Sequence, residues 1–433
     1  MKPKPERIVK LNSWLLPALI GVIMVVHLIT PYKGWQVLLI GLGGTLFLSF
    51  LWAKLLARGL ALDRQLQVEW AQVGDQITER FRIFNYSWIP ALWIEVMDHS
   101  TIPDYGTYHV KSIRFKDWIQ WEKSAFCSHR GEFSLGPTTI ITSDPFGLFS
   151  ITLKYPSSLD LIVLPPTLPL PEMDIAPGGR AGEGFVRTKT IEHSVSAASV
   201  REYNPGDSLR WVHWPTSARR DSLHVRLFDA SLSSDWWIVL DMDRAVHRGE
   251  DLDATEEYTV VLAASLANQG LRLGQAVGLV AHDENLIWHP PYPGEGQRWD
   301  IMHTLASISL GSRPFSDLLQ GIGQSLGHHT SLVLITPSPH LGWTKELLQL
   351  TRQGVIPTII FLDPASFDLG IDLKPIRKTL IDLGIRHYVI DRGMLNFFDP
   401  RTQLLEALDE PPTRKTRLSS IYWLSDVKWE IFK

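Results

Sequence analysis

The chain has 433 residues, enough for two or three domains that each bury a core of their own. Its 42 Lys and Arg residues nearly balance 46 Asp and Glu residues, so the composition does not indicate a general nucleic-acid binder. Cys127 is the single cysteine, which excludes an internal disulfide and a cysteine-based metal cluster.

Two apolar segments follow one another near the N-terminus. The first, WLLPALIGVIMVVHLIT at 14–30, has no Asp, Glu, Lys or Arg, and the second, WQVLLIGLGGTLFLSFLWAKLLA at 35–57, begins after the link PYKG. At 1.5 Å per residue, each can roughly cross a hydrocarbon core of about 30 Å, the first only just. We therefore predict a transmembrane hairpin of two helices. The alternatives are a signal peptide followed by one anchor, or two buried core helices.

Basic residues flank the two apolar segments unequally. Only Lys33 lies in the link, whereas basic residues precede and follow the pair: Lys2, Lys4, Arg7 and Lys10 before it, and Lys54, Arg58 and Arg64 after it. By the positive-inside rule, this bias predicts a two-pass protein of the cell membrane with both termini in the cytoplasm.

Short runs that alternate polar and apolar residues fill residues 61–163. Runs such as ITERFRIFN and LWIEVMD, with turn residues between them, predict an antiparallel, sandwich-like β domain. In SDPFGLFS, at 143–150, we expect a turn followed by buried aromatic side chains. Asn85-Tyr86-Ser87 matches a glycosylation acceptor, which a cytoplasmic domain would not use. Residues 164–198 are rich in Pro and Gly and predict a linker.

Strand and helix patterns alternate from residue 235 onward. DWWIVLD, at 235–241, is typical of a buried parallel strand, and QAVGLVA, TSLVLIT, IPTIIFL and RHYVI follow, separated by helical segments. The first of these helices is expected to begin at a capping box, Asp253 to Glu256, and to end at Gly270. Such alternation predicts a parallel sheet covered on both faces, with sites at the carboxyl ends of its strands. The candidate positions there are Asp241, Asp243, His282, Asp283, Thr336 and Asp363.

The pair Asp241 and Asp243 is the strongest chemical candidate, because two carboxylates at i and i+2 can ligate a hard cation such as Mg²⁺. No phosphate-binding glycine loop, G-x-S-x-G or H-E-x-x-H motif occurs. In haloacid-dehalogenase-like phosphatases the pattern is D-x-D-x-[TV], in which the first Asp is the nucleophile and the second Asp is the general acid. Here Ala245 replaces the final Thr or Val. Such a phosphatase would draw on further residues: Thr336, Lys345, Asp363 and Asp368. Capping of loop and helix amides is the structural alternative for the pair.

The segment 199–228, SVREYNPGDSLRWVHWPTSARRDSLHVRLF, concentrates Arg, His and Trp around an Asn-Pro-Gly-Asp sequence that predicts a type II turn. Its arginines suit bidentate pairing with nearby carboxylates. Its Trp and Arg residues would equally suit a protein-docking patch. A structural role and a binding role both stay open for this segment.

The stretch REYNPGDSLRWVHWPTSAR, preceded by HRGEFSLGP and SDPFGLF, resembles the bacterial domain-of-unknown-function 58 family. That family's hallmark is roughly R-x-Y-x-x-G-D-x-x-R-x-[IV]-x-W-x-x-[ST]-A-R, and eight positions match it: Arg201, Tyr203, Gly206, Asp207, Arg210, Trp214, Ala218 and Arg219. The resemblance implies a von Willebrand factor A-like C-terminal fold. It also implies a membrane protein associated with MoxR-type AAA+ ATPases.

The metal motif of the von Willebrand factor A fold is degenerate in this chain. That motif reads D-x-S-x-S or D-x-S-x-G, with hydroxyls that share a divalent ion with the acid. Here Asp243 stands in place of the first serine, Ala245 follows two residues later, and Pro337 stands where a metal-binding aspartate would follow Thr336. Metal-dependent ligand capture is therefore not favoured.

Together these patterns predict five parts: a membrane anchor at 1–60, a β domain at 61–163, a linker at 164–198, a von Willebrand factor A-like α/β domain at 199–395 and a C-terminal extension at 396–433. We expect a membrane-anchored cytoplasmic scaffold without catalytic residues, whose partners are the lipid bilayer and a MoxR-type AAA+ ATPase, and which binds no nucleic acid. The alternatives are a magnesium-dependent phosphatase that uses Asp241 and Asp243, and an adhesion module of the opposite topology.

Overall fold

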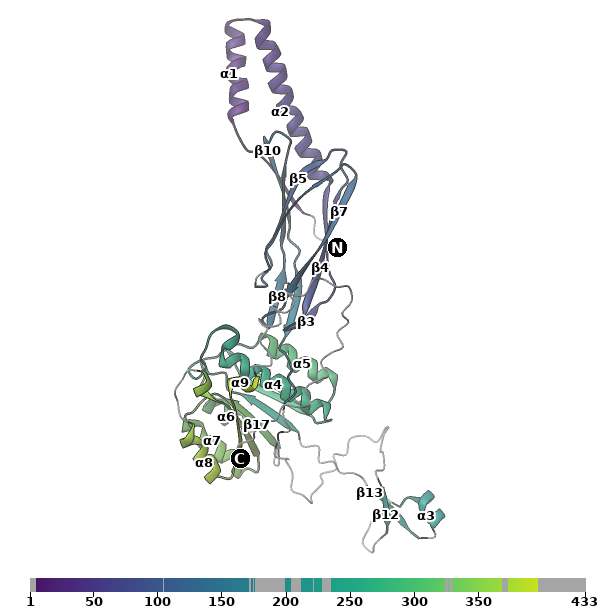
Figure 1. Cartoon of the computed structure of the whole chain (residues 1–433), viewed down its shortest axis with the longest axis vertical. Coiled ribbons are helices and arrows are strands. Elements are labelled where there is room, and N and C mark those ends of the chain that lie inside the picture. The colour runs from purple at the N-terminus through teal and green to yellow at the C-terminus, as the bar shows by residue number, and fades with distance from the viewer. Residues whose placement is uncertain are drawn as a thin grey trace. The chain divides into compact units, whose positions relative to one another are not determined.

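The computed structural model describes residues 5–103, 105–170, 173, 175, 199–203, 212–220, 222–227, 235–323, 326, 330–367 and 373–395. The chain forms two compact units, one built mainly from residues up to Pro166 and the other mainly from residues after it (Figure 1). Most of the predicted linker and all of the predicted C-terminal extension lie outside the described residues.

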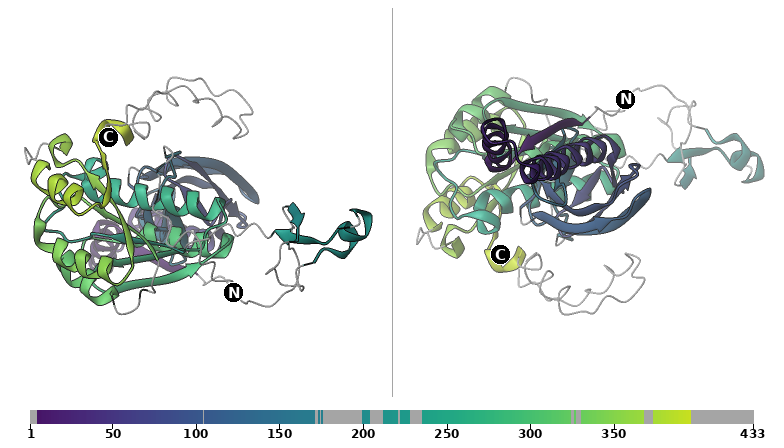
Figure 2. Two further views of the ribbon diagram at one scale, coloured as in Figure 1. Left: turned by 90° about the horizontal axis from the view of Figure 1, so that it is seen from below. Right: turned by 90° about the horizontal axis from the view of Figure 1, so that it is seen from above.

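The N-terminal unit begins with β1 (Glu6–Leu11) and two helices, α1 (Leu15–Ile29) and α2 (Lys33–Gly59). The helices lie side by side (Figures 1 and 2). With 27 residues, α2 extends over about 40 Å, and it is the one described helix long and apolar enough to cross a membrane. With 15 residues, α1 extends over only about 22 Å, so the structure shows one candidate span where two were predicted.

Three β-sheets make up the rest of this unit and are antiparallel except where β3 pairs with β11. They have the strand orders β2-β4-β7, β1-β10-β9-β5-β6 and β3-β11-β8. The strands are β2 (Leu60–Leu66), β3 (Trp70–Gln72), β4 (Gln76–Asn85), β5 (Ala91–Asp98), β6 (Thr107–Ile113), β7 (Asp117–Phe126), β8 (Gly131–Leu135), β9 (Thr138–Ser143), β10 (Phe149–Tyr155) and β11 (Leu159–Leu164). Alternate residues of β4 are buried, as its period of two predicts.

The end of α2 is part of the core of this unit. Ala53, Leu56 and Ala57 pack in one buried cluster with Ile83 of β4 and Ile140 of β9. The same cluster joins the β2-β4-β7 sheet to the five-stranded sheet. The apolar helix is therefore continuous with the folded β-sheets.

The second unit contains a six-stranded sheet with the order β16-β15-β14-β17-β18-β19. All neighbouring strands are parallel except β16, which runs antiparallel to β15. The strands are β14 (Trp236–Leu240), β15 (Val277–His282), β16 (Leu286–Tyr292), β17 (Ser331–Thr336), β18 (Ile356–Leu362) and β19 (Arg386–Ile390). The helices are α4 (Thr255–Arg272), α5 (Glu295–Ser307), α6 (Phe315–Ile322), α7 (Thr344–Arg352), α8 (Lys374–Asp382) and α9 (Arg392–Leu395).

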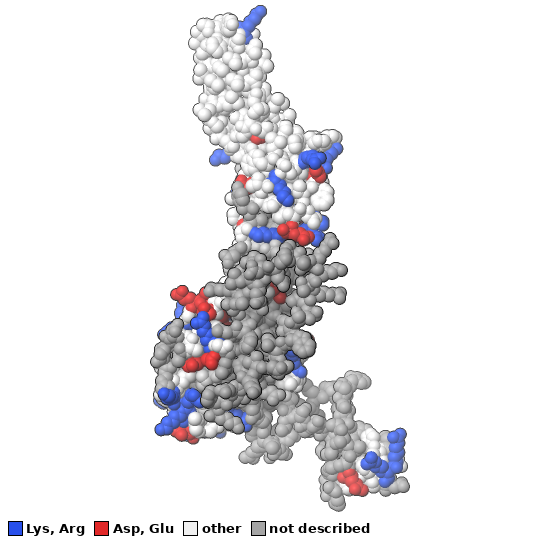
Figure 3. All heavy atoms as spheres, in the orientation of Figure 1, with Lys and Arg blue, Asp and Glu red and all other residues white. Residues whose placement is uncertain are grey.

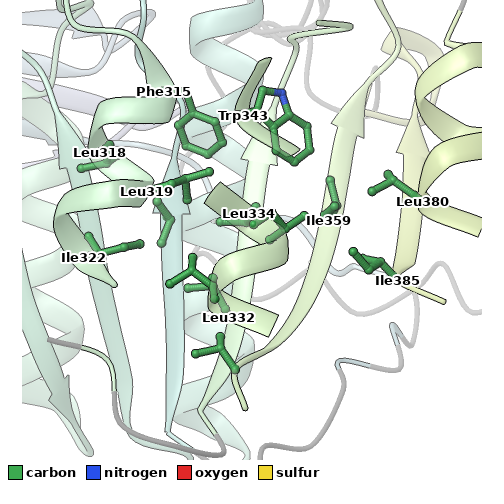
Figure 4. Close-up of a cluster of buried hydrophobic side chains, with 14 of the residues drawn as sticks. Phe315, Leu318, Leu319, Ile322, Leu332, Leu334, Trp343, Ile359, Leu380 and Ile385 are labelled. Atoms are coloured by element: carbon green, nitrogen blue, oxygen red, sulfur yellow. The ribbon is translucent and has the colours of Figure 1, made fainter. Parts of the chain in front are cut away.

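Both faces of this sheet are covered, which explains why its strands are apolar throughout. On one face, Leu334 and Ile359 pack against side chains of α6 and α8 and against Trp343 (Figure 4). Successive strand residues point to opposite faces, so Ile238 and Val333 point to the other face, where α4 packs.

Three details of this unit differ from the sequence-based expectation. The first turn of α4 has no side-chain cap, because Ala254 occupies the N-cap position and Asp253 belongs to a preceding 3₁₀ turn. The helix also continues through Gly270, where the absent side chain admits the ring of Trp236. Strand β16 was not predicted; its sequence LIWHPPY holds two prolines, which an edge strand tolerates.

A buried ion cluster joins the sheets of the N-terminal unit. Arg64 of β2 donates to Glu79 of β4 (Nη2–Oε2, 2.7 Å) and to Asp98 of β5 (Nη1–Oδ1, 2.9 Å), and both carboxylate side chains are 0% exposed. Tyr105 also donates to Glu79, and Thr138 of β9 donates to Asp98. One guanidinium therefore bridges two buried carboxylates that come from different sheets.

We expect Arg64→Met to lower the free energy of unfolding by about 3–5 kcal/mol, because removing one member of a buried ion cluster leaves uncompensated charge. Urea denaturation of the purified full-length protein in detergent measures the change.

Arg80→Met is the matched control. Arg80 bonds Glu122 on the adjacent strand, but the two side chains are 34% and 47% exposed. Such a pair contributes less than about 1 kcal/mol. Equal losses in the two variants would contradict the structural role assigned to Arg64.

Candidate functional site

The candidate site lies at the carboxyl ends of β14 and β17, which are neighbours in the middle of the six-stranded sheet. After β14 the chain moves outward to β15 on one side, whereas β18 and β19 extend the sheet on the other side of β17. The gap between β14 and β17 is therefore the topological switch point, where parallel sheets commonly hold ligands. Asp241 follows β14 directly, and Thr336 is the last residue of β17.

The carboxylate of Asp241 is completely buried and is hydrogen-bonded through both oxygens. The Thr336 hydroxyl donates to Oδ2 at 2.6 Å, and the Asp243 amide donates to Oδ1 at 3.2 Å. The Thr336 hydroxyl in turn accepts the amide of Ser338 at 2.9 Å. Asp241 thus ties the end of β14 to the end of β17 and to its own loop.

Burial raises the pKa of Asp241 to about 7, although its hydrogen bonds from Thr336 and Asp243 partly oppose this shift. His247 Nε2 lies 2.6 Å from the Asp241 carbonyl oxygen, which can only accept, so Nε2 carries the proton. Its Nδ1 lies 3.0 Å from the hydroxyl of Thr255, the first residue of α4. Burial lowers the pKa of His247 to about 4, which keeps the imidazole neutral near neutral pH.

Asp243 is only partly buried, and its Oδ1 accepts the Ala245 amide at 2.9 Å. The neighbouring backbone is bonded to a second loop: the Arg244 amide donates to Gly311 O at 3.0 Å, and the Gly311 amide donates to Met242 O at 2.9 Å. A Cβ at Gly311 would collide with the carbonyl oxygens of His282 and Asp283, so only glycine fits there. These bonds hold the loop after β14 in place.

The described residues do not form a magnesium site at Asp241 and Asp243. Both oxygens of Asp241 already accept hydrogen bonds within a fully buried setting. Among the described residues, no three His, Cys, Asp or Glu side chains are grouped so that they could hold a metal ion. Ala245, where the von Willebrand factor A motif has its second hydroxyl or glycine, brings no oxygen ligand in its side chain.

Of the predicted strand-end positions, the structure brings Asp241, Asp243 and Thr336 together. His282 is buried, with Nδ1 2.7 Å from the Asp283 carbonyl oxygen. Lys345 is exposed on α7, and Asp363 follows β18. Asp368 lies outside the described residues.

Sequence reasoning missed His247 and Thr255, which hold the backbone around Asp241. Their contact joins the loop after β14 to the first turn of α4. No local spacing rule marks such a pair, because the contact depends on the path of the loop between them.

The segment with the quoted hallmark forms a two-stranded antiparallel sheet of β12 (Ser199–Glu202) and β13 (His224–Leu227), with α3 (Trp214–Arg220) between them. His213 Nδ1 accepts the Thr216 amide at 3.2 Å at the start of α3. The buried Ser217 hydroxyl donates to His213 O at 3.0 Å and accepts the His224 amide at 2.9 Å. Helix and sheet are thus joined by hydrogen bonds.

The eight positions that match the family hallmark differ in location and exposure. Arg201 lies in β12, and Tyr203 follows it with its amide bonded to Leu223 O at 2.7 Å. Trp214 is 66% exposed on α3, where Ala218 and Arg219 are exposed as well. Gly206, Asp207 and Arg210, together with the predicted turn at 204–207, lie outside the described residues.

Residues 199–330 match the family described as "Protein of unknown function DUF58". This segment, which includes the hallmark, the parallel strands β14 and β15 and the antiparallel strand β16, therefore matches the DUF58 family, and the resemblance is confirmed.

Two bacterial relatives are themselves named as uncharacterized proteins. YeaD of Bacillus subtilis is 37% identical over 167 residues, which cover 37% of this chain and 38% of YeaD. Rv1480 of Mycobacterium tuberculosis is 28% identical over 210 residues, which cover 46% of this chain and 64% of Rv1480. In both cases the chain spans less than two thirds of the relative.

Solved structures give only distant likenesses. The CARDB domain of the PF1109 protein from Pyrococcus furiosus has a TM-score of 0.18 at 10% identity and covers 24% of this chain and 91% of that domain. The sporulation control protein Spo0M of Bacillus subtilis has a TM-score of 0.16 at 8% identity and covers 24% of this chain and 49% of Spo0M. Scores this low carry no inference about function.

We expect the free energy of unfolding of Asp241→Asn to increase relative to that of the parent as pH rises. The parent carboxyl has a pKa of about 7 when folded and an ordinary value of 3.8, so the folded state binds more protons between these values. Its free energy of unfolding therefore falls as pH rises from about 4 to about 7, by up to about 4 kcal/mol. Asparagine does not ionise and lacks this slope. Urea denaturation of both proteins from pH 4 to pH 8 measures the difference.

Asp243→Asn is the control, since this carboxylate sits in the same loop but is partly exposed. The titration of His247 has the opposite sign: the unfolded imidazole binds more protons below its ordinary pKa of 6.5, so its contribution is lost as pH falls towards 4. His247 is present in both the parent and Asp241→Asn, and the Asp241 carboxylate is not among the groups that shift its pKa, so its contribution cancels between these two proteins. A pH-independent difference between Asp241→Asn and the parent would contradict the buried, protonated carboxyl.

Proposed function

We propose that this protein is a membrane-anchored cytoplasmic scaffold that recruits a protein partner, with a MoxR-type AAA+ ATPase as the expected class of partner. The observation that carries the proposal is α2, a largely exposed apolar helix whose last two turns pack one face, Ala53, Leu56 and Ala57, into the core of the β unit. A helix built into a domain in this way would hold that domain at the bilayer.

In this proposal α1 and α2 enter the bilayer together as a hairpin. Lys33 is the one charged residue between Lys10 and Lys54, which supports insertion of the whole segment. Basic residues before and after the hairpin favour the cytoplasmic side for both of its ends. In Figure 3 the visible surface of the hairpin is uncharged between the basic group at its tip and the level of the β-sheets.

The strand order of the second unit supports a von Willebrand factor A-like fold. The resemblance implies this fold, and the observed sheet, which is parallel except for the edge strand β16 beside β15, is compatible with it. The buried core shared by two sheets of the first unit supports a sandwich-like second module.

The docking surface in this proposal is α3 of the DUF58 segment. Trp214, Arg219 and Arg220 are exposed on this helix. Tryptophan and arginine are the residue types that most often dominate the free energy of protein–protein association. The helix is joined to β13 through Ser217, which supports a preformed surface.

The geometry of Asp241 does not favour the phosphatase alternative. A nucleophilic carboxylate must be ionised and must reach the substrate. Asp241 is 0% exposed, both of its oxygens are occupied, and burial raises its pKa to about 7. The described contacts suit a residue that positions the loop.

The test is quantitative affinity purification of the full-length protein from native membranes. In a Trp214→Ala, Arg219→Ala double variant, we expect recovery of the co-purifying ATPase to fall by at least about tenfold, because two anchor residues of an interface are removed.

An Arg272→Ala, Leu273→Ala double variant is the matched control, since it removes an exposed arginine and an exposed apolar residue at the end of α4. It should recover the partner as the parent does. Equal recovery from both double variants would exclude α3 as the docking surface, and recovery of no ATPase from the parent would overturn the proposed partner.

A further inference from the structure

Three loops of the N-terminal unit lie at the end of the β-sheets where α2 enters. The strand register places them there: Leu60, which follows α2, pairs with Asn85, and Asn85 pairs with Asp117. Ala91 pairs with Ile113, and Leu11, just before α1, pairs with Phe149. We call residues 86–90, 114–118 and 144–148 the rim loops; the second of them includes Asp117 and Trp118, the first two residues of β7.

The rim loops expose aromatic side chains. The exposed fractions are 66% for Tyr86, 76% for Trp88, 59% for Phe115, 54% for Trp118 and 65% for Phe146. The exposure of Phe146 corrects the expectation that the aromatic residues of SDPFGLFS are buried again, whereas Phe149 of the same sequence packs partly into the core. Five large aromatic rings directed to solvent at one end of a domain mark an interaction surface.

The opposite end of the same sheets is different. Among the described residues of the turn between β2 and β3 and its flanks, the exposed large apolar side chains are Val68 at 43% and Trp70 at 51%. The aromatic exposure is thus concentrated at the hairpin end.

Buried polar side chains fix the backbone of the rim loops. The amide of Asn85 donates to the carbonyl oxygens of Ile89 and Arg114, and its Oδ1 accepts the amide and the hydroxyl of Ser87. Asn85 is 0% exposed, so the glycosylation motif that begins there is not available to an enzyme.

The third rim loop is held in the same manner. The buried carboxylate of Asp144 accepts the amides of Phe146 at 2.9 Å and Phe149 at 2.6 Å. The aromatic rings therefore project from rigid loops.

Basic side chains accompany the aromatic ones. Lys116 lies over the ring of Trp88, with Nζ 3.4 Å from the ring centroid, and Arg114 is exposed two residues before it. Lys54 and Arg58 are exposed on the last turns of α2. Asp117 is the one exposed acidic residue in the rim loops.

The length of α2 places these loops at the level of lipid headgroups. A helix that enters the bilayer at Lys33 crosses about 30 Å of hydrocarbon in about 20 residues and so leaves it just before Lys54. Gly59 lies roughly 8 Å further on, within the headgroup region. Its carbonyl oxygen accepts the Tyr86 amide at 2.8 Å, which ties the first rim loop to this depth.

We propose that the rim loops bind the surface of an anionic bilayer, with their aromatic rings in the interface and their basic groups against lipid phosphates. This inference rests on the proposed membrane anchor. Tryptophan and tyrosine rings favour the membrane interface, and basic residues are attracted to anionic lipids. The β unit is then seated on the membrane at a set depth.

Single-cysteine labelling of the full-length protein tests this proposal. In a Cys127→Ala background, Trp88→Cys, Phe146→Cys, Val68→Cys and Leu38→Cys are each labelled with an environment-sensitive fluorophore. The variants are reconstituted into phosphatidylcholine–phosphatidylglycerol vesicles with or without brominated acyl chains. Leu38, on α2, reports on the anchor, and Val68 reports on the far end of the β-sheets.

We expect brominated lipid to quench the labels at positions 38, 88 and 146 and to leave the label at position 68 unquenched. Quenching at 38 with positions 88 and 146 as bright as 68 would overturn the rim proposal and keep the anchor. No quenching at 38 would overturn the anchor itself, and the rim proposal with it.

A separate comparison tests whether the basic groups of the rim loops bind anionic lipid. We expect quenching at position 88 to decrease in vesicles of phosphatidylcholine alone, and in a Lys116→Glu, Arg114→Glu variant in anionic vesicles. Unchanged quenching in both would overturn the assignment of the basic groups to lipid phosphates.

Discussion

The hydrogen bond between Thr336 and the buried carboxyl of Asp241 is the contact on which the centre of the α/β unit depends. This hydrogen bond joins the ends of β14 and β17, where the chain connections diverge. The backbone carbonyl oxygen of Asp241 also accepts a hydrogen bond from His247. A buried carboxyl is costly unless it is hydrogen-bonded or protonated; both oxygens of Asp241 accept hydrogen bonds, and burial raises its pKa to about 7. This carboxyl therefore serves to position the loop, and catalysis would require an accessible group.

The N-terminal unit also buries polar groups that join distant strands, but here the central group is a cation, the guanidinium of Arg64. Arg64 lies between Glu79 and Asp98, so a buried cation joins sheets that also share an apolar core. Buried ionic groups of this kind contribute little net stability but penalise any other arrangement. Because α2 ends within that core, a fixed geometry of the sheets also fixes the direction in which the apolar helix leaves them.

Periodicity predicted most of the architecture. The change from long apolar runs to alternating runs, and then to alternating strands and helices, separated the hairpin, the antiparallel sheets and the parallel sheet. It failed for β1 and β16, because β1 is short and precedes the hairpin, and β16 carries Pro290 and Pro291. The expected capping box at Asp253 failed because Thr255 is buried and bonds His247 and the backbone of Arg248.

The sequence by itself determined the order of the modules, the candidate membrane helix, the DUF58 segment and the placement of Asp241, Asp243 and Thr336 at strand ends. These follow from local periodicity and composition, which a linear chain displays directly. Only the tertiary structure decided that Asp241 is buried and bonded, that Arg64 holds two carboxylates, and that the aromatic residues of three distant loops gather at one end of the β-sheets. The physical reason is that burial and hydrogen-bond partners depend on segments far apart in the chain, whose register no local pattern specifies.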